Sequence, residues 1–279
     1  VGFFCDAGGW VLEMAILLRS DEGLRIRVAR GRGHGLATHL DRYHIREDLT
    51  IFQNQEELHS VLLSGGQTKR WLGEFFDVSV PVKVYQQIQE HCGDNPFSTR
   101  SNPARLMAVD WVSSQGFLVT VPKECKDILQ SSLLESGLQD STDEMINYLR
   151  LQQGWPLGND IPEKTLPQEV GLNARAISLT KGCYLGQETV ARLDALGHVN
   201  RRLVVLAVEK GGSMVVGDSV ASNDEVVSRV TSVGCLGNQE VSLAMAIIPL
   251  KSMQQKSNLT VAGKAANVVS PVLLDTLMT

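Results

Sequence analysis

The segment richest in reactive groups runs from Lys181 to Glu188 and reads Lys-Gly-Cys-Tyr-Leu-Gly-Gln-Glu. Its glycines, Gly182 and Gly186, allow positive φ angles and a close approach of other atoms to the backbone. Cys183 stands near a predicted helix start and two residues from a lysine, and both features favour the thiolate, which attacks electrophiles and binds metals. The alternative is that Cys183 packs inside the fold, since cysteine is among the most buried residue types.

Other motifs in the sequence point to no further site. The same segment is not a phosphate-binding loop, because that loop needs a lysine after its second glycine and here the lysine precedes the first. Gly31-x-Gly33-x-Gly35 has the wrong spacing for a dinucleotide site. The six histidines include no pair of the zinc-protease kind, so we interpret them as ordinary histidines and expect no metal site.

Composition excludes several classes of protein. Of the 279 residues, 43% belong to the AVILMFWYC set, which is enough for a folded core. The 26 basic and 31 acidic residues give a net charge of −5, so we expect no binding of nucleic acid through bulk charge. No apolar run approaches the roughly 18 residues that span a bilayer, and no secretory signal is readable. The five cysteines include no Cys-x-x-Cys pair, and we therefore expect a reduced, cytoplasmic protein without a membrane partner.

Apolar patterns predict the elements that position the Lys181–Glu188 segment. Helical spacing predicts helices at residues 33–43, 56–63, 126–134 and 143–151, and a further short helix after Gly186. Alternating or short apolar runs predict two strands within residues 11–29, and others at 49–52, 105–110 and 117–121. This mixture predicts an α+β fold.

The rest of the chain contains two regions that differ in composition and pattern. Residues 155–171 are too rich in proline for a helix and predict an irregular passage. After residue 200, short apolar runs separated by glycine turns are typical of a small barrel or sandwich. We therefore predict an α+β body over residues 1–200 and a β-barrel domain over residues 201–279.

Lys181–Glu188, with Arg192 four residues later, resembles the signature of the YgfZ group of folate-binding proteins. That group is related to the T-protein aminomethyltransferase of the glycine cleavage system. Asp110 with the following Ser-Gln-Gly-Phe, and Leu-Arg-Leu-Gln-Gln-Gly-Trp-Pro from Leu149, resemble the family's upstream landmarks. The stretch Val-Ser-Arg-Val-Thr-Ser from Val227 resembles its carboxyl-terminal barrel.

The resemblance implies an aminomethyltransferase-like α+β body around a tetrahydrofolate cavity, closed by a small C-terminal β-barrel, with the family's opening strand and helix preceding Val1. It implies tetrahydrofolate or a derivative as the cofactor, and iron–sulfur enzymes or cluster-assembly proteins as partners. Cys183 would be the functional thiol. The cofactor-binding residues it implies are Arg150 and Gln152 near the pterin, and Lys181, Gln187, Glu188 and Arg192 around the signature.

Two other functions stay open. The first is a folate-dependent aminomethyl or methyl transferase, with Glu13 and Asp110 as candidate acid/base groups. The transferase branch usually has Glu where Gln152 stands here, and Met14 stands where that branch has an acidic residue. The second is a scaffold that binds partners but not folate.

Overall fold

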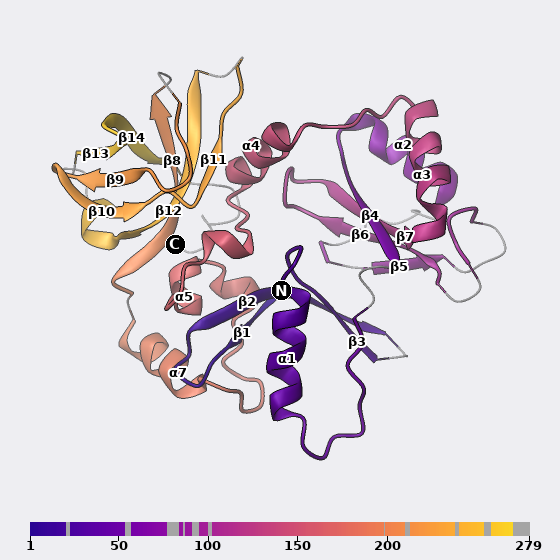
Figure 1. Ribbon diagram of the computed structural model, residues 1–279, viewed down its shortest axis with the longest axis horizontal. Coiled ribbons are helices and arrows are strands. Elements are labelled where there is room, and N and C mark those ends of the chain that lie inside the picture. Colours follow the sequence, from indigo (N-terminus) through magenta and orange to yellow (C-terminus); the bar gives the residue numbers. More distant parts are fainter. Residues whose placement is uncertain are drawn as a thin grey trace. The chain divides into compact units, whose positions relative to one another are not determined.

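The computed structural model describes residues 1–20, 23–53, 57–76, 84–85, 87–90, 95–99, 102–197, 199–209, 213–237, 240–253 and 258–269. Cys92, His91 and His198, which entered the interpretation of cysteines and histidines above, lie outside these residues. The chain divides into two compact units, one formed by Val1–Ile45 with Asp143–Thr279 and the other by Arg46–Thr142. The second unit is therefore an insertion in the sequence of the first (Figure 1).

The first unit begins with a three-stranded antiparallel sheet in the order β1-β2-β3. Its strands are β1 (Gly2–Cys5), β2 (Val11–Ser20) and β3 (Gly23–Arg27), and the helix α1 (Gly33–Tyr43) follows. These elements confirm the two strands predicted within residues 11–29 and the helix predicted at 33–43; the turn residues Asp21 and Glu22 lie outside the described residues. The register between β1 and β2 shifts between Phe4 and Cys5, as at a β-bulge.

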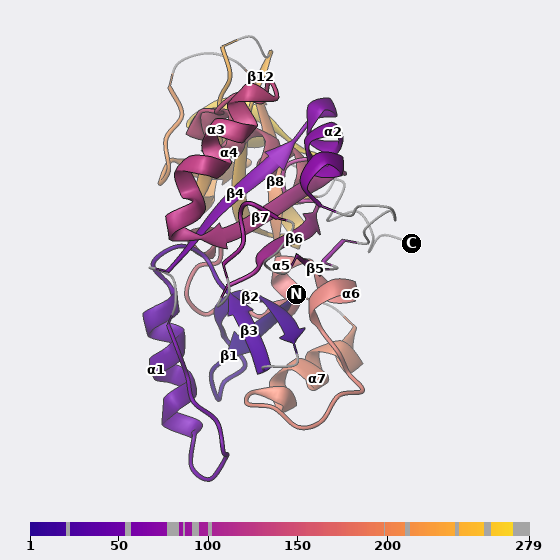
Figure 2. The ribbon, with the colours of Figure 1, turned by 90° about the vertical axis from the view of Figure 1, so that its right-hand side faces the viewer.

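The second unit contains a four-stranded antiparallel sheet in the order β4-β7-β6-β5. Its elements are β4 (Leu58–Ser64), α2 (Gly66–Phe75), β5 (Gln87–Glu90), β6 (Ala104–Val109), β7 (Gly116–Pro122), the 3-10 turn Lys123–Cys125 and α3 (Lys126–Glu135). Figure 2 shows α2 and α3 beside this sheet, and the two helices share one core with it. That core includes Trp71, Leu72, Leu106, Val119, Leu129 and Leu133. The strands predicted at 105–110 and 117–121 and the helix predicted at 126–134 are confirmed.

Two predictions in this unit were wrong. Residues 58–64 form the strand β4 instead of a helix, because they pair along their whole length with β7, from Leu58 opposite Pro122 to Ser64 opposite Gly116. A short apolar run has no periodicity that separates a strand from a helix, so tertiary pairing decides. The predicted strand at 49–52 is absent from the described residues; Leu49 and Phe52 lie in an exposed irregular segment, Phe52 with 82% of its side chain accessible.

The chain returns to the first unit through α4 (Asp143–Gln153). The passage predicted to be irregular holds only the 3-10 turn Gly158–Asp160 and the short helix α5 (Pro167–Val170), and α6 (Asn173–Ala176) and α7 (Gln187–Leu196) follow it. The predicted helices at 143–151 and after Gly186 are confirmed as α4 and α7. Both helices end at a glycine with positive φ, Gly154 and Gly197, which is the usual way for a helix to stop.

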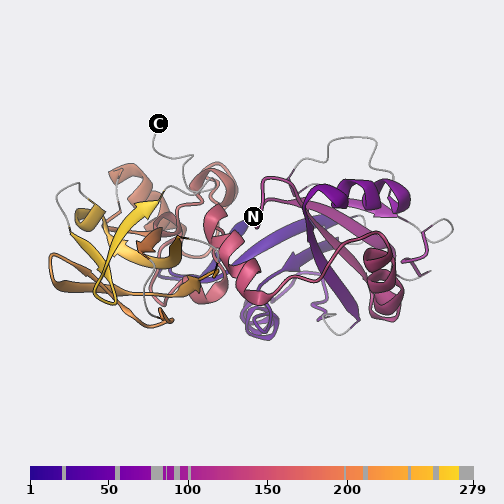
Figure 3. The same ribbon diagram turned by 90° about the horizontal axis from the view of Figure 1, so that it is seen from above.

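A curled seven-stranded antiparallel sheet ends the described chain, as Figure 3 shows in orange and yellow. Its order is β10-β9-β13-β14-β8-β12-β11, and β10 also contacts β12. The strands are β8 (Arg201–Glu209), β9 (Ser219–Ser222), β10 (Glu225–Arg229), β11 (Ser232–Gly234), β12 (Val241–Pro249), β13 (Leu259–Val261) and β14 (Lys264–Val269), with the 3-10 turn Leu250–Met253 after β12. This sheet encloses its own apolar core, so the α+β class with a strand-rich C-terminal part is confirmed.

Two further points concern the organisation of the chain. The predicted domain boundary near residue 200 falls between α7 and β8, inside the first compact unit, and stays a prediction. None of the helices among the described residues has the length and apolar character needed to cross a membrane.

Candidate functional site

The signature loop, which we define as residues 181–186, leads directly into α7. Gly186 stands before the helix with φ of 80°, a conformation that residues with a Cβ rarely adopt. The amide of Tyr184 donates to Oε1 of Gln187 at 3.3 Å, and the amide of Gln187 donates back to the carbonyl of Tyr184 at 3.2 Å. The predicted site residue Gln187 therefore closes the loop onto the helix start.

The turn between β1 and β2 fixes the position of the signature loop. A Cβ at Gly186 would lie 2.6 Å from both the carbonyl oxygen of Asp6 and the Cα of Gly9, and a Cβ at Gly9 would lie 3.0 Å from Thr189 in α7. The turn is itself braced, because Oδ1 of Asp6 accepts hydrogen bonds from the amides of Gly8 and Trp10 at 2.9 and 3.0 Å. The β1–β2 turn and the signature loop, which are far apart in the sequence, thus pack closely through their backbone atoms.

Cys183 lies exposed at the surface of this loop as a free thiol. Its neighbour Lys181 is also exposed and places Nζ 4.1 Å from the centre of the Tyr184 ring, a cation–π contact. The predicted alternative of a packed cysteine does not describe this residue. An accessible thiol beside a fixed ammonium group can act as a nucleophile or as a metal ligand.

A second thiol, Cys5, belongs to the same neighbourhood and was not singled out from the sequence. It is buried at the end of β1, next to Asp6. Burial, and secondarily the charge of Asp6, raise the pKa of Cys5 to about 11, while the charge of Lys181 opposes the rise. Burial and then the charge of Cys5 also raise the pKa of Tyr184. Nothing in the residue spacing could have revealed this proximity, because it depends on the turn packing against Gly186.

Glu13, one of the two candidate acid/base groups, is buried in β2 and held by an ion pair. Nε of Arg32 donates to its Oε2 at 2.6 Å, and Nη2 of Arg32 donates to the carbonyl of Leu12 at 3.1 Å. Its other oxygen faces Gly158, where an added Cβ would lie 3.4 Å away. The adjacent Met14 is buried as well.

Asp110, the other candidate acid/base group, belongs to the second unit. It is buried at the end of β6 and accepts a hydrogen bond of 3.3 Å from the hydroxyl of Tyr85. Glu13 and Asp110 therefore belong to different compact units, and each has a partner within its own unit.

Arg150, predicted to lie near a pterin, makes internal contacts with every nitrogen of its buried guanidinium. It donates to Asn147 at 2.9 Å, to the carbonyl of Trp155 at 3.2 Å, to Asp160 at 2.9 Å and to the hydroxyl of Ser232 at 2.6 Å. Asp160 is fully buried and also accepts from Thr231 at 2.9 Å. Arg150 and Asp160 thus join α4 and the proline-rich passage to the start of β11.

The other predicted site residues are spread over the surface of the first unit. Gln152 is exposed on α4, two residues from the buried Arg150, and Glu188 and Arg192 are exposed on α7. Lys181 lies against Tyr184, as described above. The structure therefore places Lys181 and Cys183 in the signature loop and Gln187 at the start of α7, and the roles of all the predicted site residues stay predictions.

Besides Asp160 and Thr165, the proline-rich passage holds two buried polar residues that sequence reasoning missed, Gln168 and Glu169. Glu169 accepts from Arg201 through both carboxylate oxygens, at 2.7 and 3.1 Å, and also receives the amide of Leu166 at 2.8 Å. Nε2 of Gln168 donates to the carbonyl of Val190 in α7 at 2.8 Å. These contacts tie α5 to both β8 and α7, so the passage supports the helix that follows the signature loop.

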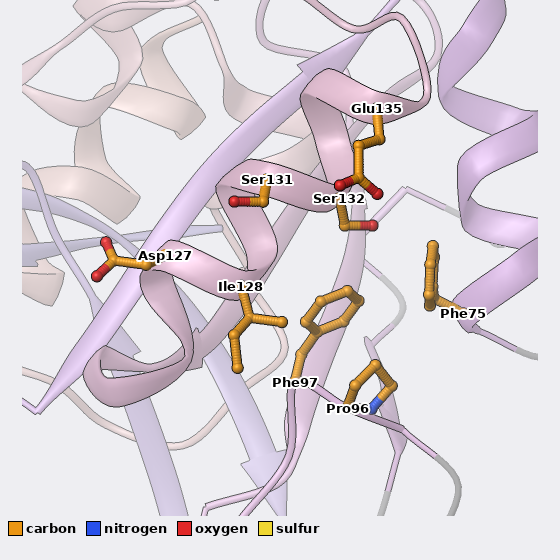
Figure 4. Close-up of a pocket in the computed structure, with 8 residues that line it drawn as sticks. All are labelled: Phe75, Pro96, Phe97, Asp127, Ile128, Ser131, Ser132 and Glu135. Carbon is orange, nitrogen blue, oxygen red and sulfur yellow. The ribbon is translucent and has the colours of Figure 1, made fainter.

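A hollow of about 440 Å³ lies in the second unit, against α3 (Figure 4). Its lining consists of Phe75, Pro96, Phe97, Asp127, Ile128, Ser131, Ser132 and Glu135. None of the predicted site residues lines it. Within the described part of the chain, no group of three or more His, Cys, Asp or Glu side chains could hold a metal ion.

Comparison with known proteins connects this geometry to a family. The chain is 27% identical over 208 residues to the tRNA-modifying protein YgfZ of Colwellia psychrerythraea, which covers 74% of this chain and 59% of the relative. It is 28% identical over 211 residues to the protein of the same name from Escherichia coli, and 27% identical over 220 residues to that of Yersinia enterocolitica. The chain spans about three fifths of the length of these relatives, 58% and 62% for the latter two.

A solved structure agrees with these relatives. The glycine cleavage system aminomethyltransferase T from Bartonella henselae matches 98% of this chain and 74% of its own with a TM-score of 0.75. The chain is similar to YgfZ-type proteins. No protein-family model matches it. At 19% identity, the aminomethyltransferase match shows that this chain has that enzyme's fold.

Proposed function

We propose that this protein binds tetrahydrofolate or a derivative and supports the assembly or repair of iron–sulfur enzymes, with Cys183 as its functional thiol. The observation that carries the proposal is the exposed, free Cys183 on a loop that Gly186 fixes against the β1–β2 turn. A structural cysteine would be buried, and a loop held through close backbone contact keeps the thiol presented to a partner.

The exposed residues of the first unit suit a folate. The amide of Gln152 offers both a donor and an acceptor to the edge of a pterin, and the cationic side chains of Lys181 and Arg192 suit the carboxylates of a folate tail. Arg150 has its guanidinium committed to Asp160, Ser232 and Trp155, so we assign it to positioning α4, which carries Gln152.

Binding of folate is tested by titrating the purified protein with tetrahydrofolate and following intrinsic fluorescence or heat. We expect binding at micromolar protein and a loss of roughly tenfold in affinity, about 1.4 kcal/mol, for Gln152→Ala. Gln130→Ala, at an exposed position of α3, is the matched control and should bind as the parent protein does. If the parent protein did not bind tetrahydrofolate, the alternative of a scaffold without a folate site would be favoured.

The iron–sulfur role follows from the chemistry of a single thiol. Clusters normally take four protein ligands, so one thiolate can contact a cluster only transiently or together with a partner's ligands. We therefore expect the partners to be iron–sulfur enzymes or cluster-assembly proteins. Cells in which Cys183→Ala replaces the parent protein should lose activity of cluster-dependent enzymes, while Cys235→Ala, another exposed free cysteine, should not. Full activity with a folded Cys183→Ala protein would contradict the role of the thiol.

The alternative function, a folate-dependent aminomethyl or methyl transferase, has weaker support from the site. Glu13 is paired with Arg32 and buried, and Met14 cannot transfer a proton. Turnover of an aminomethyl or methyl donor by the purified protein, lost in Glu13→Gln or Asp110→Asn, would establish this alternative.

The relatives are named as tRNA-modifying proteins, whereas this chain has a net charge of −5. We propose that any link to tRNA passes through an iron–sulfur client that itself modifies tRNA, because the acidic balance disfavours direct binding. Tight, salt-dependent binding of tRNA to the purified chain would contradict this proposal.

A further inference from the structure

The buried thiol of Cys5 has no part in the function proposed above, yet it lies next to the signature loop. Asp6, the residue after it, presents its carbonyl oxygen to Gly186 at a separation that leaves no room for a Cβ. The shift of register between β1 and β2 falls between Phe4 and Cys5, at a kind of irregularity that re-aims a side chain. The close approach of Asp6 to Gly186 therefore places the residue after Cys5 against the end of the signature loop.

Besides Asp6, the electrostatic neighbours of Cys5 belong to the signature loop. The charge of Lys181 acts on Cys5, and the charge of Cys5 acts on Tyr184. Lys181 and Tyr184 themselves touch, with Nζ 4.1 Å from the ring centre. Cys183 stands between these two residues in the chain, and both interact electrostatically with Cys5.

We infer that Cys183 and Cys5 form a redox pair, in which the exposed thiol reacts first and the buried thiol resolves the product as a disulfide. In the first step the Cys183 thiolate attacks one oxygen of hydrogen peroxide, the O–O bond breaks, and sulfenic acid and hydroxide form. The hydroxide takes up the proton that the thiol lost on ionising and becomes water. In the second step the Cys5 sulfur attacks the sulfenic sulfur, and its thiol proton leaves with the hydroxyl group as water. The two thiols together lose two electrons, which the peroxide accepts.

The exposure of Cys183 and the burial of Cys5 suit this order of reaction. Peroxide reaches an exposed thiol, and the product is protected from further oxidation when a second thiol lies within reach. The two Cα atoms of a disulfide lie about 4.4–6.8 Å apart, so bond formation requires Cys5 and Cys183 to reach that separation. Residues 181–185 belong to no helix or strand, and Lys181, Gly182 and Cys183 are exposed. The Cys183 side chain can therefore change position while Gly186 stays against the β1–β2 turn. This inference goes beyond the proposed function, since it requires neither folate nor an iron–sulfur partner.

The test uses the reduced, purified chain treated with one equivalent of hydrogen peroxide. Remaining thiols are then alkylated under denaturing conditions, and the protein is analysed by intact mass and by peptide mapping. We expect a mass lower by two hydrogen atoms and a peptide pair joined through Cys5 and Cys183. A Cys183 that remains as sulfenic or sulfinic acid while Cys5 is fully alkylated would overturn the inference. A disulfide from Cys183 to Cys92, Cys125, Cys235 or a second molecule would also overturn it.

A dimedone trap for sulfenic acid supplies a second measurement. In Cys5→Ala we expect a several-fold increase in dimedone labelling of Cys183, because the resolving thiol is missing, whereas Cys235→Ala should label as the parent protein does. Equal labelling of Cys5→Ala and the parent protein would contradict the inference. If Cys5→Ala fails to fold, the peptide map of the parent protein decides alone.

Discussion

The carbonyl oxygen of Asp6 lies against the backbone of Gly186, so closely that a Cβ at position 186 would approach it to 2.6 Å. This contact connects the first turn of the chain with the loop that carries Cys183. Glycine is required at position 186 for two reasons, the neighbouring backbone and the positive φ of 80°.

Gly186→Ala should therefore lower the free energy of unfolding by about 2–4 kcal/mol, the sum of an unfavourable φ and a steric overlap. It should also change the rate at which Cys183 reacts with a thiol reagent. Gly182→Ala is the matched control, because no atom lies within 4 Å of its added Cβ. Urea unfolding and alkylation kinetics measure the two effects. Equal stability of the two variants would contradict the contact.

A similar contact joins α4 to the curled sheet. A Cβ at Gly234 in β11 would lie 2.8 Å from the Cα of Tyr148, and neither backbone can yield easily. We expect Gly234→Ala to cost about 1–3 kcal/mol as measured by urea unfolding. Gly35→Ala in α1, which meets nothing within 4 Å, should leave stability unchanged or raise it slightly.

The buried ion pair between Arg150 and Asp160 predicts a large effect of a small change. Asp160→Asn removes the charge that balances Arg150 and presents an amide to groups that all donate, so we expect a loss of about 3–5 kcal/mol. Glu74→Gln, in the exposed pair of Glu74 with Arg70, should change stability by no more than about 0.5 kcal/mol. If Asp160→Asn lowered the free energy of unfolding only slightly, the ion pair would not be buried in solution.

The raised pKa of Cys5 predicts a loss of stability at alkaline pH. The thiol has a pKa near 9.0 in the unfolded chain and about 11 in the folded one, so the folded state holds this proton more tightly. The contribution of this proton to the free energy of unfolding is complete below pH 9.0 and disappears as the pH rises through about 11. Unfolding measured in the presence of a reductant should show a steeper decline over this interval for the parent protein than for Cys5→Ala. Parallel curves would contradict the burial of this thiol.

The sequence predicted most elements of the fold and part of the site, and the errors have physical causes. The helices α1, α3, α4 and α7 have capping glycines or clear apolar spacing that local analysis detects. The strand β4 was missed because its identity depends on pairing with β7, about 60 residues farther along. The motif around Cys183 was visible in the sequence, whereas its contact with Cys5 depends on how the β1–β2 turn packs.

Arg150 shows a different limit of sequence reasoning. Its place in the Leu-Arg-Leu-Gln-Gln-Gly-Trp-Pro stretch identified an important residue, but not its partners. Those partners, Asp160 and Ser232, lie 10 and 82 positions away in the sequence. Only the tertiary fold brings them to the buried guanidinium. A resemblance in sequence can therefore locate an arginine without distinguishing ligand binding from internal support.

The order of the two compact units has a consequence for synthesis on the ribosome. Residues 46–142 form a continuous stretch and can reach their native contacts before the chain beyond them has emerged. The first 45 residues must wait, since the signature loop and α7 that cover the β1–β2 turn are made much later. The β1–β2 turn therefore lacks the backbone that packs against it until the signature loop and α7 have been made.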